Sequence, residues 1–173
     1  TMNPIEQEGT YPLPEAQVDR FMMKVVVDYP TQTEEREILA RMATTTQDNN
    51  VECVMQPEAI SNARKLIDQI YVDNQIADYI VELVQITRTP EKVSEELAEF
   101  VEYGASPRAT LALTLSAKAN AFLDGRGYVT PQDVKDLAPD VLRHRIATTY
   151  EAEAEGKTSD DVIATILDFV PVP

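Results

Sequence analysis

Apolar residues recur every three or four positions along most of the chain, from residue 33 to the C-terminus. Within residues 73–87, for example, Ile76, Ile80 and Leu83 fall on one stripe, which is typical of a helix that buries one face. The same spacing is found in several segments: 34–46, 57–70, 73–87, 94–103, 106–123, 130–146 and 158–170. The pattern therefore predicts a mainly α protein, a bundle of about five to seven helices.

Capping residues indicate where the later helices begin and end. Ser106-Pro107 and Thr130-Pro131 each place a hydroxyl cap before a proline at the first helical position. Gly104 is predicted to end the preceding helix in left-handed backbone. In the helix that follows Ser106 we expect four apolar residues to lie inside: Leu111, Leu115, Ala119 and Phe122.

The first thirty residues differ from the rest. Residues 9–14 contain a glycine and two prolines, which favour turns and loops. Residues 21–27 are apolar and rich in valine, which predicts a buried strand. No second strand is evident downstream, although an isolated strand leaves its backbone groups unpaired. We therefore divide the chain into residues 1–30, a remnant of an α/β domain, and residues 31–173, a helical domain.

Charge and hydropathy exclude two classes of partner. The 173 residues include 15 Lys and Arg against 30 Asp and Glu, a formal net charge of −15. Such a surface repels phosphate backbones, so we expect no nucleic-acid partner and no binding to anionic membranes. No apolar run is long enough to span a bilayer and no signal peptide is evident, so we expect no membrane insertion and a cytoplasmic location.

The scarcity of cysteine and histidine limits the chemistry of the chain. Cys53 and His144 are single, so neither an internal disulfide nor a Cys/His zinc site is expected, and we predict no metal site. His144 is expected to be solvated on the open face of its helix. No glycine falls in a GxxxxGK[ST] arrangement, so the chain contains no phosphate-cradling loop.

Three polar residues are candidates for function, each with a structural alternative. Arg20 precedes the predicted strand, where it forms either a surface ion pair or a phosphate contact. Arg108 lies in the first turn of a helix, where a cation opposes the helix dipole but a bound anion is favoured. Asn3 precedes Pro4 and is, on its own, an ordinary turn residue.

Several blocks of sequence, taken together, closely resemble the MoxR family of AAA+ ATPases. The blocks are TMNP at residues 1–4, EQEGTYPLPEAQ at 6–17, DRF at 19–21, GASPRA at 104–109 and GRGYVTPQDV at 125–134. The resemblance extends over essentially the whole chain. It implies an α/β nucleotide-binding core followed by a helical lid, with residues 1–30 as a remnant of the core and residues 31–173 as the lid.

The resemblance also implies roles for the three candidates. Asn3 matches sensor 1, the polar residue that orients the attacking water. Arg20 matches the arginine finger, which reaches the site of a neighbouring subunit and stabilises charge on the transferred phosphoryl group. Arg108 matches sensor 2, which contacts the phosphates of the nucleotide from the lid, either in its own subunit or across the subunit interface.

The family further implies an ATPase that uses ATP and Mg²⁺, forms a ring by self-association, most simply a hexamer, and remodels or matures a protein client in a chaperone-like way. The family's Walker A and Walker B motifs precede sensor 1 and are not found in this chain. We therefore expect a C-terminal fragment that, alone, neither hydrolyses ATP nor binds it tightly. The alternative is a free-standing acidic helical module that binds protein without nucleotide. A phosphate-binding loop encoded upstream would distinguish the two.

Overall fold

Helices account for most of the structure, and the prediction of a mainly α protein is confirmed. The computed structural model describes residues 13–45 and 51–173. The seven segments with helical spacing correspond to α2 (Gln32–Met42), α3 (Pro57–Gln69), α4 (Asn74–Ile86), α5 (Glu95–Phe100), α6 (Pro107–Leu123), α7 (Pro131–Leu142) and α9 (Ser159–Phe169). The remaining elements are short: α1 (Glu15–Val18), the 3₁₀ helix η1 (Pro90–Lys92), α8 (Tyr150–Ala154) and strands β1 (Val101–Tyr103) and β2 (Ala147–Thr148).

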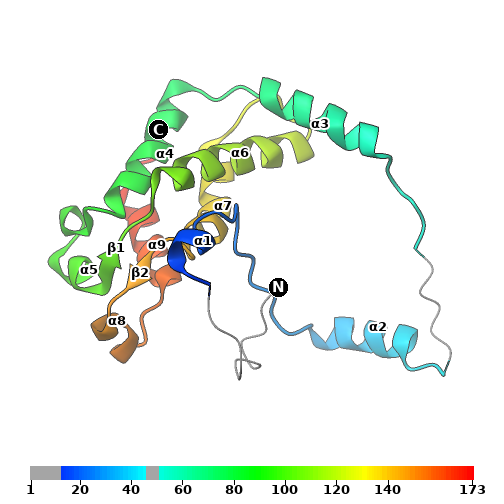
Figure 1. The fold of residues 1–173 in the computed structure, drawn as a ribbon, viewed down its shortest axis with the longest axis horizontal. Helices are drawn as coiled ribbons and strands as arrows, with labels where there is room; N and C mark the ends of the chain where they lie inside the picture. Colours follow the sequence, from blue (N-terminus) through cyan, green and yellow to red (C-terminus); the bar gives the residue numbers. More distant parts are fainter. Residues whose placement is uncertain (1–12, 46–50) are drawn as a thin grey trace.

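The hydrophobic core lies between α4, α6, α7 and α9. Helix α6 packs against both α4 and α7, and α9 packs against α7 and α4 (Figure 1). The largest side chains with almost no exposure come from all four helices: Ile80, Leu83, Leu113, Leu142, Ile163 and Ile166. The four helices thus enclose one continuous apolar interior.

The buried face of α6 differs from the prediction. Leu111 and Leu115, expected inside, are 66% and 47% exposed. The face turned to the core is instead made mostly of small side chains: Ala109, Ala112, Leu113, Ser116, Ala117 and Ala121. Because α6 has a neighbour on each side, small residues at these positions let both backbones approach, and the leucines are left outside.

The strand predicted at residues 21–27 is wrong. These residues have no regular secondary structure, and Val25, Val26 and Val27 are 62–89% exposed. In the described part of the chain, β1 and β2 pair antiparallel with each other, and no strand lies beside residues 21–27. Without a neighbouring strand, an apolar sequence alone does not form a strand.

The prediction of a left-handed cap at Gly104 is wrong, and this glycine is needed instead for a close approach between two backbone segments. Its backbone does not have positive φ, whereas that of Gly125 and Gly156 does. A Cβ atom at position 104 would lie only 2.1 Å from the backbone oxygen of Thr87. The contact is reinforced by the Ala105 amide, which donates to Thr87 Oγ1 over 2.9 Å. The turn before α6 is thereby fixed on the end of α4.

Helix α2 contributes nothing to the core. Every residue of α2 is exposed, and Figure 1 shows the helix apart from the others. Its supports are local: a capping box between Thr31 and Glu34, and an ion pair of 3.6 Å between Glu37 and Arg41.

Candidate functional site

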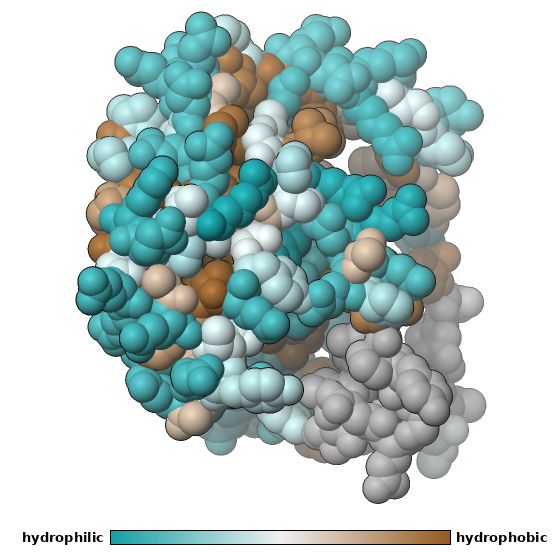
Figure 2. Space-filling model, turned by 60° about the vertical axis from the view of Figure 1, so that its left-hand side comes forward, coloured by the Kyte–Doolittle hydropathy of each residue, from teal (hydrophilic) through white to brown (hydrophobic). Residues whose placement is uncertain are grey.

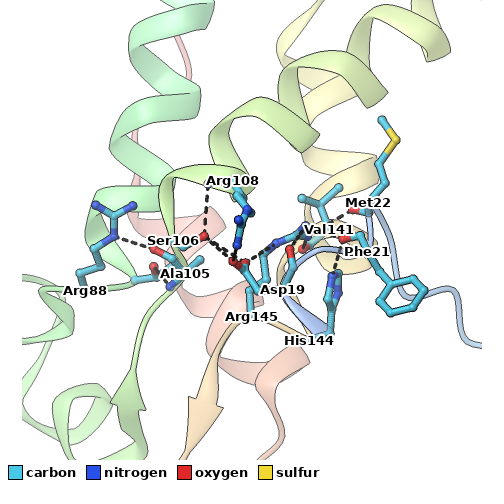
Figure 3. A network of polar contacts seen from close by, with 11 residues as sticks. Asp19, Phe21, Met22, Arg88, Ala105, Ser106, Arg108, Val141, His144 and Arg145 are labelled. Carbon is cyan, nitrogen blue, oxygen red and sulfur yellow. Dashed lines mark hydrogen bonds and ion pairs between the residues drawn. The ribbon is translucent and has the colours of Figure 1, made fainter. Parts of the chain in front are cut away.

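The carboxylate of Asp19 lies at the centre of a polar cluster between the N-terminal segment and the helical bundle (Figure 3). Ser106 Oγ donates to it, at 3.0 and 2.9 Å from its two oxygens. Arg108 Nη1 lies 3.2 Å from Oδ2, and Arg145 Nε lies 3.1 Å from Oδ1. One carboxylate therefore binds a hydroxyl and two guanidinium groups that lie 87 to 126 residues away from it in sequence.

Ser106 joins the cluster to the start of α6. The backbone amide of Arg108 donates to Ser106 Oγ over 3.2 Å, which caps the helix as predicted. The preceding Ala105 is held through its carbonyl, which accepts from Arg88 Nε over 2.6 Å. Since Arg108 is the second residue of α6, this cap fixes where its backbone lies.

Arg145 is buried, with only 2% of its side chain exposed. Besides the carboxylate, its guanidinium donates to the backbone oxygens of Asp19 (3.1 Å), Phe21 (2.5 Å) and Met22 (3.2 Å). It also donates to the Val141 carbonyl near the end of α7. Burial lowers the pKa of Arg145, and the ion pair with Asp19 opposes that effect. The acceptors around it satisfy the buried cation.

The two residues before Arg145 hold the same segment. Arg143 Nη1 donates to the Lys24 carbonyl over 2.6 Å, while its Nε pairs with Asp160 at 3.0 Å. His144 Nε2 lies 3.1 Å from the Phe21 carbonyl. The prediction of a solvated His144 on a helix face is therefore wrong: the residue lies in the turn after α7, is half-buried, and has its ring bonded to the Phe21 carbonyl.

Two shifts in pKa follow from this packing. Burial would raise the pKa of Asp19. The hydrogen bonds from Ser106 and Arg108 and the charge of Arg145 lower this pKa by more than burial raises it, so the carboxylate stays ionised. Burial lowers the pKa of His144, and the nearby cations of Arg145 and Lys24 add to that effect. The Phe21 hydrogen bond and the charge of Asp19 only partly oppose it. His144 is accordingly neutral at pH 7, with Nε2–H donating to Phe21.

Of the three candidate residues, Arg108 contacts the Asp19 carboxylate, and Arg20 is next to Asp19 in the sequence. Arg108 is bound to Asp19, with 55% of its side chain exposed. Arg20 follows Asp19 directly and is exposed, and no residue that the structure describes pairs with its guanidinium. Asn3 lies outside the described residues. The roles of all three are left untested by this geometry.

Sequence reasoning missed Asp19, Arg143 and Arg145. The signal available was the run Arg143-His144-Arg145, three basic or weakly basic side chains at the end of a helix. Cations at a helix C-terminus interact favourably with the helix dipole, and this local effect is enough to explain why basic residues occur there. The bonds from this run to residues 19–24 join positions 119 to 126 residues apart, and local sequence patterns carry no information on such contacts.

The described residues contain no group of three or more side chains suited to hold a metal ion. None of the helices described is both long and apolar enough to cross a membrane. Within the cluster around Asp19, the exposed guanidinium of Arg108 at the start of α6 is suited to bind a phosphate.

Two family profiles match the chain. The AAA lid domain matches residues 94–166, from the cap of α5 into α9. The ATPase family associated with various cellular activities (AAA) matches residues 1–23, which include Asn3 and Arg20.

Individual relatives match along nearly the whole chain. Chaperone MoxR1 from Mycobacterium tuberculosis is 41% identical over 100% of this chain and 46% of its own length. Protein MoxR from Paracoccus denitrificans is 32% identical over 99% of this chain and 54% of its own length. A crystal structure of an ATPase candidate from Cytophaga hutchinsonii has a TM-score of 0.91 at 43% identity, covering 99% of this chain and 52% of that one. The chain thus spans about half the length of the proteins it matches.

Proposed function

Because the chain belongs to the MoxR family of AAA+ ATPases, we propose that it supplies the arginine finger, sensor 1 and the lid of a ring-forming ATPase. Residues 1–30 belong to the nucleotide-binding core in this proposal, and residues 31–173 form the lid. The Walker A loop is contributed by sequence other than these 173 residues, which contain no such motif.

One observation carries the proposal: a single carboxylate, Asp19, joins the segment of Arg20 to Arg108 on the lid. Arg20 is exposed on a segment whose backbone is fixed, which suits a group that reaches another subunit. Arg108 is exposed at a helix start, where a phosphate is favoured. The two arginines are therefore available for phosphate from one connected piece of structure.

The chemistry follows the roles proposed for the three residues. ATP with Mg²⁺ supplies the phosphoryl group that is transferred to water. Arg20 stabilises the charge that develops on that group in the neighbour's site, and Asn3 orients the attacking water. Arg108 binds the phosphates of the nucleotide and links their presence to the position of the lid.

The biological role in this proposal is chaperone-like. A ring, most simply a hexamer, uses the motion of its lids to remodel or mature a protein client in the cytoplasm. The net charge of −15 favours protein over nucleic acid as the client.

Substitution of Arg20 tests the finger. In the full-length ATPase that includes this chain, Arg20→Ala should lower turnover about 1,000-fold or more, the range typical of arginine fingers. The dissociation constant for ATP should change little, since the residue acts on the transition state in another subunit. Arg36→Ala, on the exposed helix α2, is the matched control. Normal turnover by the Arg20→Ala protein would refute the role.

Substitution of Arg108 tests sensor 2. Arg108→Ala should weaken ATP binding about tenfold and lower turnover as well, because a charged hydrogen bond to phosphate is lost. Equilibrium binding of ATP and steady-state turnover measure the two effects separately. If both quantities stay at the wild-type value, Arg108 does not contact the nucleotide.

A further inference from the structure

We propose that Asp19 is a positioning residue that couples Arg108 to Arg20. When Arg108 binds a phosphate, the contacts that fix the segment of Arg20 change. The inference rests on the proposed function, because it assumes that Arg108 binds nucleotide and that Arg20 acts as the finger. It adds a residue to which neither the family resemblance nor the comparisons assign a role.

The two cations bound to Asp19 are unequal. Arg145 is buried and is fixed by four backbone carbonyls in addition to the carboxylate. Arg108 makes a single contact of 3.2 Å with Asp19 and has 55% of its side chain exposed. Arg108 is therefore the partner that can leave the carboxylate, and Arg145 is the partner that stays.

A polyphosphate is a stronger competitor for Arg108 than Asp19 is. It carries several negative charges and matches the guanidinium fork, whereas Asp19 carries one charge that is already shared with Arg145. In this proposal Arg108 exchanges Asp19 for phosphate when nucleotide binds. The carboxylate is then left with Ser106 and Arg145.

The change reaches Arg20 through Arg145. The guanidinium of Arg145 binds the Asp19 carboxylate and the backbone on both sides of residue 20, at Asp19, Phe21 and Met22. Losing Arg108 alters the charge balance at this carboxylate and so the forces on the segment that presents Arg20. Coupling of this kind is reciprocal, so engagement of Arg20 in a neighbouring site also changes the affinity for ATP.

Asp19→Asn distinguishes this coupling from a purely structural ion pair. The substitution keeps the shape and removes the charge. In the full-length ATPase we expect ATP to bind about three- to tenfold more tightly, because Arg108 is no longer held by a carboxylate. Turnover should nevertheless fall at least about tenfold, because the segment of Arg20 is held less firmly. Opposite signs in binding and turnover are the signature.

A structural role predicts a different result. Loss of a purely structural contact would lower turnover and leave ATP affinity unchanged or weaker, which would overturn the proposal. In Asp19→Asn/Arg108→Ala the gain in affinity should disappear, and a gain that persists would also overturn it. Asp124→Asn is the matched control, since Asp124 forms an exposed ion pair with Arg126 outside this cluster.

The single substitutions separate the two hypotheses. If Arg20→Ala and Arg108→Ala behave as ordinary surface variants, the proposed function fails. If both behave as expected and Asp19→Asn does not shift binding and turnover in opposite directions, only the coupling fails.

A measurement on the wild-type protein covers the case in which Asp19→Asn does not fold. Amide hydrogen exchange is compared with and without a slowly hydrolysed ATP analogue. We expect a changed exchange rate at Phe21 and Lys24, whose amides donate to the Val18 and Asp140 carbonyls. Unchanged rates at both amides, with the analogue bound, would overturn the coupling.

Discussion

Asp133 shows how a buried carboxylate is stabilised in this fold. Its side chain is 3% exposed and accepts from Arg126, Thr130 and Asn120, with Arg126 Nη2 at 2.6 Å. Burial alone would raise the pKa of Asp133, but the hydrogen bonds from Arg126, Thr130 and Asn120 lower it by more than burial raises it. The carboxylate thereby connects the turn after α6 to the capping box of α7.

The stability that Asp133 provides should depend on pH. Because its pKa is lowered by folding, the contribution is present above about pH 4, the pKa of an unfolded aspartate, and is lost as pH falls towards the folded value. Asp133→Asn should therefore lower the free energy of unfolding by about 2–4 kcal/mol at pH 7. The difference from wild type should narrow at pH 3.

Urea unfolding at both pH values measures this effect. Asp136→Asn is the control on the same helix: it is exposed and should change the free energy by less than about 0.5 kcal/mol. A deficit for Asp133→Asn that is the same size at pH 7 and pH 3 would contradict the expectation.

Single residues were predictable where their contacts are local. Ser106, Thr130 and Thr158 cap helices as their neighbours in sequence indicate, since a cap bonds an amide two or three residues away. The bonds of Arg145 and His144 to residues 19–22 join positions more than 120 residues apart. Such pairings follow from the assembled fold, so the candidate site was predicted only in part: Arg20 and Arg108 were named, but Asp19 and Arg145 were not.

At the scale of elements, α6 has two apolar sides of unequal importance. Leu113 is fully buried among the helices, whereas Leu115 is 47% exposed. Leu113→Ala should lower the free energy of unfolding by about 2–5 kcal/mol, because it removes contacts and leaves a cavity. Leu115→Ala should cost less than about 1 kcal/mol. Thermal or urea unfolding of the two variants measures these changes. Equal losses in the free energy of unfolding would show that the helix is rotated from the orientation described.

Gly104 sets how closely β1 and α6 follow the end of α4. Gly104→Ala places a Cβ 2.1 Å from the Thr87 oxygen, a backbone atom that must then move. We expect a loss of about 1–3 kcal/mol in stability. Gly127→Ala is the matched control, because a Cβ at position 127 has no atom within 4 Å. A Gly104→Ala variant as stable as Gly127→Ala would contradict the close approach.

The existence of elements was predictable, but their orientation and pairing were less so. Helical periodicity and caps placed all the longer helices, since both are properties of a short stretch of chain. The buried face of α6 depends on two neighbours, and the strand expected at residues 21–27 depends on a partner strand. Neither can be read from the segment itself.

For the whole molecule, the net charge is the property that most affects which partners can bind. The net charge is −15, and on the face in Figure 2 hydrophilic side chains predominate, with apolar ones between them in small groups. Several of the exposed apolar residues lie on α2 and α3, among them Leu39 and Leu66. A surface of this kind favours protein partners over polyanions.

The chain should therefore fail to bind duplex DNA. At about 0.15 M salt, where non-specific binders typically bind with dissociation constants of about 1–100 μM, we expect no change in the anisotropy of a labelled duplex with up to 100 μM protein. A basic DNA-binding protein confirms that the probe responds. Saturable binding below 100 μM would show that a local basic patch outweighs the net charge.

Residues 143–145 bond to residues 19–24 mainly through backbone carbonyls, and within this described stretch Asp19 is the one residue whose side chain also takes part in these bonds. Residues 143–145 bond to the carbonyls of four residues in this stretch, while the side chains of Phe21 and Met22 are 57% and 46% exposed. A carbonyl is present whatever the side chain attached to the same residue. Substitutions at positions 21 and 22 should therefore leave these bonds in place, whereas substitution of Arg143 or Arg145 removes their donors.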